Sequence, residues 1–238
     1  MGRAFEFRKA RKMKRWSNMS KTFTRIGREI IIAVKESGPD PYSNSKLRAI
    51  IQNAKAANMP KDNIERAIKK ASEKSSVNLK EVLLEGYAPH GIAILVEAAT
   101  DNNNRTVANI RSYFNKCDGS LATSGSVDFL FHHLCFFQIK YEGIDIEKLE
   151  LELIDFGVLE LSKLENELSI SAKFEDFGSI QKELERRELE ISSIEFEREA
   201  KINKTLPEVG RLKVERLINM IDEDEDVQNV YHDMNTID

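Results

Sequence analysis

The order of the elements in residues 127–200 constrains the fold of this chain more than any other feature. In some stretches apolar and polar residues alternate, which is typical of strands, and in others apolar residues recur every three or four positions, which is typical of helices. The predicted elements are, in order, a strand at Phe129–Tyr141 with a break near His132–His133, a helix at Ile146–Phe156, strands at Val158–Leu161 and Leu168–Ala172, a helix at Phe177–Arg187 and a strand at Glu190–Phe196. This strand–helix–strand–strand–helix–strand order is the ferredoxin-like pattern.

The segments on either side of this run are predicted to share a second sheet. The elements that we expect there are a strand at Val82–Tyr87, a turn at Ala88–Gly91, a second strand at Ile92–Ala98, a helix that follows Asp101–Asn104 and carries Val107, Ile110 and Phe114, a helix at Val209–Ile221 and a last strand at Val227–Tyr231. The closing helix and strand are expected to complete the sheet begun at 80–98. The second domain is therefore predicted to be discontinuous.

The first 77 residues are predicted to form three helices. Ser20 is placed to cap a helix that ends at Gly38-Pro39. In Lys46–Lys70 the helical period of apolar residues restarts after Asn58, which indicates two short helices joined by a tight corner, with Pro60 in the first turn of the second helix. Their apolar stripes are Leu47, Ile50, Ile51 and Ala54, and then Ile64, Ala67, Ile68 and Ala71.

The sequence therefore predicts an α+β, multidomain protein. An N-terminal three-helix domain is followed by two α/β-sandwich, ferredoxin-like domains, one inserted in the other. The predicted limits are 1–77 for the basic helical domain, 78–132 plus 204–238 for the discontinuous domain, and 133–203 for the inserted domain. Residues 1–19 are expected to be an arm that docks on the second domain.

The net charge of −4 conceals a strong asymmetry between the two parts of the chain. Residues 1–80 carry 20 Lys and Arg against 7 Asp and Glu, a local net charge of +13. Residues 81–238 carry 16 against 33, a local net charge of −17. A short charged run is usually only a solvated face, but a bias of this size indicates a basic module that meets a polyanion, attached to an acidic body.

The basic residues of the first domain are the predicted nucleic-acid contacts. In the arm they are interleaved with Phe5, Phe7 and Trp16, which either stack on bases or dock the arm on the body, and Phe5–Phe7 alternates as a short strand would. The basic N-terminus superficially resembles a mitochondrial presequence, but it runs directly into a patterned helix, which favours a folded or nucleic-acid-contacting arm. The predicted contacts are Arg8, Arg11, Lys12, Lys14, Arg15, Lys21, Arg25, Arg28, Lys46, Arg48, Lys55, Lys61, Arg66, Lys69 and Lys70.

Composition argues against several other classes of protein. A hydrophobic fraction of 41% and a charged fraction of 32% fit a well-charged globular protein. No apolar run approaches the roughly 20 residues that span a membrane, and no secretion signal is apparent. The two cysteines, Cys117 and Cys135, have neither disulfide-scaffold nor zinc-site spacing, so a reducing cytoplasm is the expected compartment.

The polar clusters of the acidic part give no catalytic, cofactor or metal site, and we predict a protein that is not an enzyme. His132 and His133 would point to opposite faces of a strand, and His90 and His232 are expected at the surface. The run Asp222–Asp226 is expected to be a solvated acidic turn. Two further clusters are expected to be structural: Asp101–Asn104 as a cap for the following helix, and Gly119–Ser126 as a connection rather than a phosphate loop.

Four motifs, spread in order along the chain, carry a family likeness. They are Ala57-Asn58-Met59-Pro60-Lys61-Asp62-Asn63-Ile64, Glu85-Gly86-Tyr87, Thr100-Asp101-Asn102-Asn103-Asn104-Arg105-Thr106 and Thr123-Ser124-Gly125-Ser126-Val127. Together they resemble the YebC/PmpR family of probable transcriptional regulators, whose mitochondrial relatives activate translation of a cytochrome oxidase subunit. The resemblance implies a helical domain followed by two α/β domains, one inserted in the other. Many members begin with a Gly-His-Ser-Lys-Trp-like segment, from which Gly2–Arg8 departs.

Two functions are compatible with these features. The first is a DNA-binding transcriptional regulator that acts through the basic helical domain, with the helix after Pro60 as the candidate reader. The alternative is a ribosome- or rRNA-associated translation factor that relieves stalling or activates translation, as the resemblance implies for some members. Charge alone does not separate DNA from ribosomal RNA as the partner.

Overall fold

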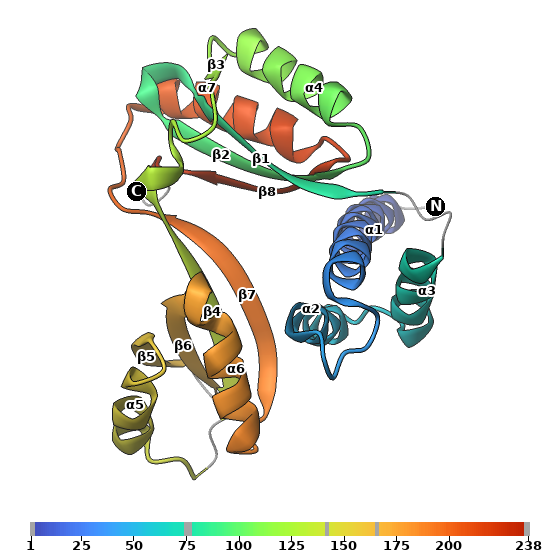
Figure 1. The fold of residues 1–238 in the computed structure, drawn as a ribbon. Helices are drawn as coiled ribbons and strands as arrows, with labels where there is room; N and C mark the ends of the chain where they lie inside the picture. Colours follow the sequence, from blue (N-terminus) through green and yellow to red (C-terminus); the bar gives the residue numbers. More distant parts are fainter. Residues whose placement is uncertain (1–2, 74–77, 141–142, 165–166, 236–238) are drawn as a thin grey trace. The chain divides into compact units, whose positions relative to one another are not determined.

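The computed structural model describes residues 3–73, 78–140, 143–164 and 167–235, with the backbone alone for 3–18 and 164. The chain divides into two compact units, the N-terminal unit Met1–Ser76 and the body Val77–Asp238. Within the described residues the N-terminal unit is helical and the body contains two four-stranded sheets. The predicted α+β class, with helices first and sheets after them, is confirmed (Figure 1).

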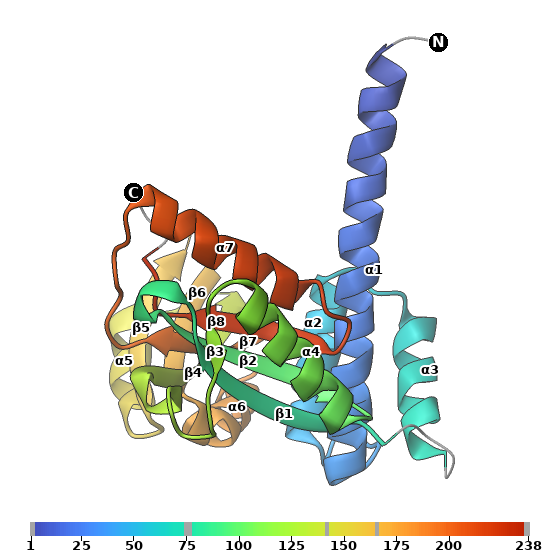
Figure 2. The same cartoon turned by 90° about the horizontal axis from the view of Figure 1, so that it is seen from above.

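The N-terminal unit is built around one long helix, α1 (Arg3–Ser37), against which α2 (Ser45–Ala56) and α3 (Lys61–Ser72) pack. Figure 2 shows α1 as a continuous rod. The predicted start at Ser20 and the suggested strand at Phe5–Phe7 are wrong, since α1 begins at Arg3. The physical reason is that residues 3–26 contain neither Gly nor Pro and are rich in Lys, Arg, Ala and Met, which favour helix. The predicted end is confirmed, because Gly38 adopts a φ of 87° directly after Ser37.

The corners between the three helices are fixed by asparagines. Asn44 is buried and donates hydrogen bonds to the carbonyls of Ala33 and Gly38, both at 2.8 Å, while its side-chain oxygen caps α2 at Leu47. Asn58 ends α2 with a φ of 58°. The tight corner after Asn58 is confirmed, although Pro60 stands just before α3 rather than in its first turn. Buried Leu47, Ile50, Ala54, Ile64 and Ala71 confirm the predicted apolar stripes.

The first sheet of the body has the strand order β3-β1-β2-β8. Its elements are β1 (Lys80–Tyr87), the short helix η1 (Pro89–Gly91), β2 (Ala93–Thr100), α4 (Asn103–Lys116), β3 (Ser120–Leu121), α7 (Glu208–Asp222) and β8 (Val227–His232). Helices α4 and α7 cover one face of this sheet (Figure 1). Because β8 pairs with β2, the prediction that the chain returns to complete the first sheet is confirmed.

The second sheet has the order β5-β6-β4-β7. Its elements are η2 (Asp128–Leu130), β4 (Phe131–Lys140), α5 (Ile146–Ile154), β5 (Val158–Leu164), β6 (Glu167–Lys173), η3 (Phe174–Asp176), α6 (Phe177–Arg186) and β7 (Ile191–Ala200). The predicted element order is confirmed. The predicted break near His132–His133 is wrong, because both residues pair with β7, opposite Glu199 and Arg198. Their side chains do differ in environment: His132 is exposed, whereas His133 stacks on Phe174 with the ring centroids 4.0 Å apart.

The two sheets of the body are joined by side chains as well as by the chain itself. The guanidinium of Arg198 on β7 donates to Glu97 on β2 at 2.9 Å and to Asp128 at 2.7 Å. The Tyr231 hydroxyl on β8 donates to the Phe196 carbonyl on β7 at 3.3 Å.

We propose that the body consists of two domains with the limits given above, 133–203 inserted between 78–132 and 204–238.

Candidate nucleic-acid interface

The predicted contact residues have different structural roles in the N-terminal unit. Five of them lie on the part of α1 whose side chains are outside the described residues, namely Arg8, Arg11, Lys12, Lys14 and Arg15. The side chains of Phe5, Phe7 and Trp16 are outside the described residues too. Further along α1, Lys21, Arg25 and Arg28 are half-buried. Exposed side chains are found for Lys55, Lys61, Arg66, Lys69 and Lys70.

Several of the predicted contacts have partners within the unit. The Arg48 guanidinium donates to the carbonyls of Pro41 at 2.7 Å and Tyr42 at 3.1 Å, so it holds the loop between α1 and α2. Lys46 forms an ion pair with Glu36 at 3.1 Å. Binding a phosphate would cost Arg48 its hydrogen bonds to these two carbonyl groups. Arg48 is therefore better explained as a structural residue.

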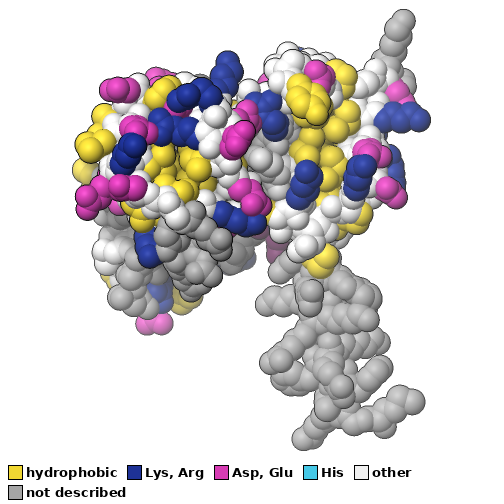
Figure 3. Space-filling view, turned by 90° about the horizontal axis from the view of Figure 1, so that it is seen from below, with side chains coloured by type: hydrophobic (Ala, Val, Ile, Leu, Met, Phe, Trp, Pro, Cys, Tyr) yellow, Lys and Arg dark blue, Asp and Glu magenta, His cyan; other side chains and the backbone are white. Residues whose placement is uncertain are grey.

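The outer face of α3 is the best candidate contact surface. Ile64 and Ala71 face the interior, while Arg66, Lys69 and Lys70 lie on the opposite side of the helix and are exposed. We call these three residues the α3 cation row. Among the described residues none of the three forms an ion pair, whereas Lys61 pairs with Glu65 at 3.3 Å. Figure 3 shows Lys and Arg side chains around an exposed apolar strip on one face of this unit.

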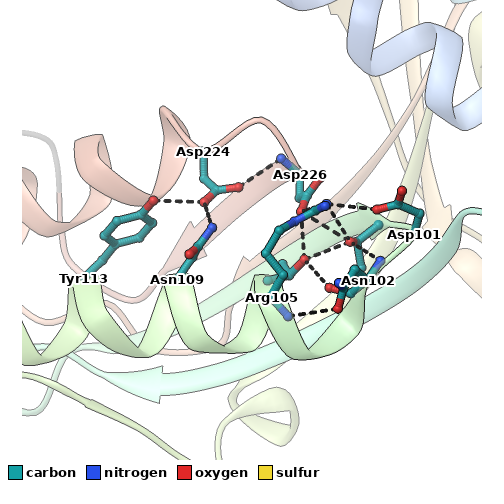
Figure 4. A network of polar contacts seen from close by, with 9 residues as sticks. Asp101, Asn102, Arg105, Asn109, Tyr113, Asp224 and Asp226 are labelled. Atoms are coloured by element: carbon teal, nitrogen blue, oxygen red, sulfur yellow. Dashed lines mark hydrogen bonds and ion pairs between the residues drawn. The ribbon is translucent and has the colours of Figure 1, made fainter.

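A second concentration of polar side chains lies in the body, where α4 begins. Asn102 caps α4 by accepting from the Arg105 amide at 3.1 Å, which confirms the predicted capping role of Asp101–Asn104. Arg105 donates to Asp101 at 2.9 Å and to Asp226 at 2.8 Å (Figure 4). The contact with Asp226 joins residues 121 positions apart in the chain.

The expectation that Asp222–Asp226 is a solvated turn is wrong for two of its members. Asp226 is 5% exposed and accepts hydrogen bonds from the hydroxyls of Thr106 at 2.8 Å and Thr100 at 3.2 Å. Asp224 accepts from the Tyr113 hydroxyl at 2.9 Å and from Asn109 at 3.2 Å. Glu223 and Glu225, in contrast, are exposed. Asp224 and Asp226 therefore hold α4 in place through hydrogen bonds and an ion pair, and we call these two residues the clamp on α4.

The loop at Gly119–Ser126 also has an internal partner. Glu85 is 2% exposed and accepts from the backbone N–H groups of Gly125 and Val127, both at 2.6 Å, and of Asp128 at 3.0 Å. The loop thus holds an anion, but the anion is the carboxylate of Glu85, in agreement with the expected structural role. Burial by itself raises the pKa of Glu85, yet these N–H groups outweigh it and hold that pKa below its usual value.

The remaining histidines and cysteines of the described residues are structural or solvent-exposed. Within the ranges that the structure describes, no cluster of three or more His, Cys, Asp and Glu side chains is arranged to hold a metal ion. None of the described helices is long and apolar enough to cross a membrane. His90 is exposed as expected, but His232 is half-buried, and burial lowers its pKa. Cys117 and Cys135 are free and buried.

Comparison with known proteins places the whole chain in one family. Residues 3–74 match the family model described as the TACO1/YebC protein N-terminal domain, and residues 79–234 match the TACO1/YebC second and third domain. A protein of Flavobacterium johnsoniae named "Probable transcriptional regulatory protein" is 66% identical over 234 residues, which are 98% of this chain and 99% of that one. A protein of the same name from Porphyromonas gingivalis is 57% identical over 235 residues, 98% of this chain and 97% of that one.

A solved structure agrees with this assignment. The crystal structure of a conserved hypothetical protein from Aquifex aeolicus has a TM-score of 0.74 and 35% identity, and the match covers 91% of this chain and 90% of that one. The resemblance found in the four sequence motifs is confirmed. With both family models matched and relatives aligned over nearly their full length, this chain belongs to the TACO1/YebC family.

Proposed function

We propose that the protein is a nucleic-acid-binding regulator, and specifically a DNA-binding transcriptional regulator that acts through its N-terminal helical unit. The observation that carries the proposal is the α3 cation row, Arg66, Lys69 and Lys70, on the face of α3 opposite its buried side. Unlike Arg48 and Lys46, these side chains are available to phosphate oxygens. The names of the relatives, probable transcriptional regulatory proteins, support the same role.

The other basic side chains supplement this row. Lys55 and Lys61 are exposed on the neighbouring parts of α2 and α3. The net charge of +13 over residues 1–80 supplies the longer-range attraction to a polyanion. We place the protein in the cytoplasm, where its two free cysteines stay reduced.

Neutralising the α3 cation row is expected to weaken nucleic-acid binding and reduce its dependence on salt. The variant changes Arg66, Lys69 and Lys70 to Gln, which keeps helix propensity and removes three positive charges. Each lost phosphate contact lowers the slope of log K against log salt concentration by about 0.9 on duplex DNA, so the slope should fall by about 2 to 3. Fluorescence anisotropy with labelled duplex DNA and with a ribosomal RNA fragment, over a salt series, measures it.

A matched control removes the same charge from the body. Arg111, Lys182 and Lys201 are exposed there, and their triple change to Gln should leave the salt slope unchanged. Equal slopes for the wild type and the α3 variant on both nucleic acids would refute the proposed interface.

Two further experiments separate DNA from ribosomal RNA as the target. Co-migration with ribosomal subunits, when lysate treated with DNase is sedimented, assigns the function to translation. A defined footprint on promoter DNA assigns it to transcription.

A further inference from the structure

Helix α7 of the body exposes a mixed apolar and basic face. Val209 and Leu212 are 73% and 56% exposed, although the helix buries Val214, Leu217 and Ile221 on its other side. Lys213 lies four positions after Val209, and Arg216 lies four positions after Leu212, so the four side chains share one face of the helix. We call Val209, Leu212, Lys213 and Arg216 the α7 face.

Helix α5 of the same body exposes the corresponding arrangement with the opposite charge. Leu151 and Ile154 are 70% and 54% exposed, while Leu149 and Leu153 are buried. Glu150 lies four positions before Ile154, and Asp155 lies four positions after Leu151. We call Glu150, Leu151, Ile154 and Asp155 the α5 face.

Asp155, Lys213 and Arg216 are exposed and Glu150 is half-buried, so the charges of both faces can reach a partner. In the described part of the chain Lys213, Arg216, Glu150 and Asp155 form no ion pair, whereas other charges of these helices do. Arg211 pairs with Glu215 on α7 at 3.7 Å, and Lys148 pairs with Glu152 on α5 at 3.9 Å. The two faces therefore carry aliphatic groups without cover and charges without counter-charges.

The sequence around the α5 face is strongly acidic, and it also contains another exposed aliphatic side chain. Residues 145–160 contain six acidic residues and one basic residue, and Leu159 on β5 is a further exposed aliphatic side chain, at 56%. In Figure 3 exposed apolar side chains lie beside acidic ones at the left of the body. Residues 201–216, in contrast, contain five basic and two acidic residues within a body that is acidic as a whole.

We propose that the α7 face of one copy of this protein binds the α5 face of a second copy. Each face supplies two exposed aliphatic side chains, and the cations of one match the carboxylates of the other. A nucleic acid would satisfy Lys213 and Arg216, but it would be repelled by Glu150 and Asp155 and would leave Leu151 and Ile154 exposed. A second copy satisfies both faces at once.

Because the two faces differ, the contact is heterologous, with one face from each partner. Such a contact leaves a free α7 face at one end of a pair and a free α5 face at the other. Self-association therefore continues beyond two copies unless the rotation between copies closes a ring. This contact between copies is independent of what the N-terminal unit binds.

Two charge-reversed variants test the contact. In the first, Lys213 and Arg216 are changed to Glu; in the second, Glu150 and Asp155 are changed to Lys. Each variant alone presents two faces of like charge and should remain at the mass of the 27.2 kDa chain. An equimolar mixture restores both pairings, because each variant keeps the face that the other has reversed. The mixture should therefore associate like the wild type.

The measurement is sedimentation equilibrium of nuclease-treated protein at low salt, at concentrations up to about 1 mM, where even a weak interface is populated. The wild type should associate, and high salt should weaken that association. As the control, Arg111 and Lys201, both exposed elsewhere on the body, are changed to Glu, and this variant should associate like the wild type. The proposal is overturned if the wild type stays monomeric or if either charge-reversed variant alone still associates. It is also overturned if the mixture of the two variants does not associate.

Discussion

Replacing Asp226 with Ala is expected to lower the free energy of unfolding by about 3 kcal/mol. The change removes a carboxylate that is 5% exposed and that accepts from Thr100, Thr106 and Arg105. The two threonines are buried and lose a charged acceptor, which is the costly part of the substitution. Arg105 has 47% of its side chain exposed, so water recovers part of its loss. Urea denaturation followed by circular dichroism measures the effect.

Glu225 provides the control for this prediction. It lies next to Asp226 in the same acidic run but is exposed, so Glu225→Ala should change stability by less than about 0.5 kcal/mol. An equal effect of the two substitutions would show that the acidic run acts through its total charge. It would thereby contradict the clamp on α4.

Replacing Glu85 with Gln is expected to have a similar cost, about 3 kcal/mol near neutral pH. The two carboxylate oxygens accept from Gly125, Val127 and Asp128. Gln has the same shape but turns one of these acceptors into an NH₂ group, which then faces backbone donors. At least one buried N–H group is left without an acceptor. Glu199→Gln, at an exposed position of β7, is the control and should be nearly neutral.

The cost of Glu85→Gln should depend on pH with a definite sign. The pKa of Glu85 in the folded protein lies below the ordinary value of 4.5, so its stabilisation is fully present above about pH 4.5 and is lost as the pH falls through the folded pKa. The difference in unfolding free energy between wild type and variant should therefore shrink in acid. A difference that stays constant from pH 7 to pH 3 would mean that the carboxylate charge is not what the loop binds.

The elements whose apolar residues recur regularly were predictable from the sequence. The element order from Phe129 to Phe196 gave the second sheet, because alternation and helical period report which side of each element is buried. Asn44 illustrates what a local signal leaves out. Its position before α2 suggests a cap, but its bonds to Ala33 and Gly38 follow only from the packing of α1 against α2.

Two predictions were wrong for different physical reasons, that for Asp226 and that for the start of α1. Asp226 was expected to be solvated because charged residues usually are, yet it accepts hydrogen bonds from side chains that come from elsewhere in the chain. Arg48 also has partners within the protein, and its predicted contact with nucleic acid stays a prediction. The start of α1 failed for a different reason. Ser20 has the residue type of a cap, but uninterrupted helix formers on its N-terminal side allow the helix to continue, and its carbonyl accepts from Thr24.

The sequence by itself determined the family, the α+β class and the basic character of the first 77 residues, since motif identity, periodicity and charge are properties of residue order. Only the tertiary structure decided what three of the four family motifs do. Glu85-Gly86-Tyr87 meets Thr123–Val127 through the Glu85 carboxylate and the Tyr87 hydroxyl, which donates to Ser126 at 2.8 Å. Thr100–Thr106 closes on Asp226. These contacts join positions 39 to 126 residues apart, and such pairings are fixed by three-dimensional packing, which local sequence does not encode.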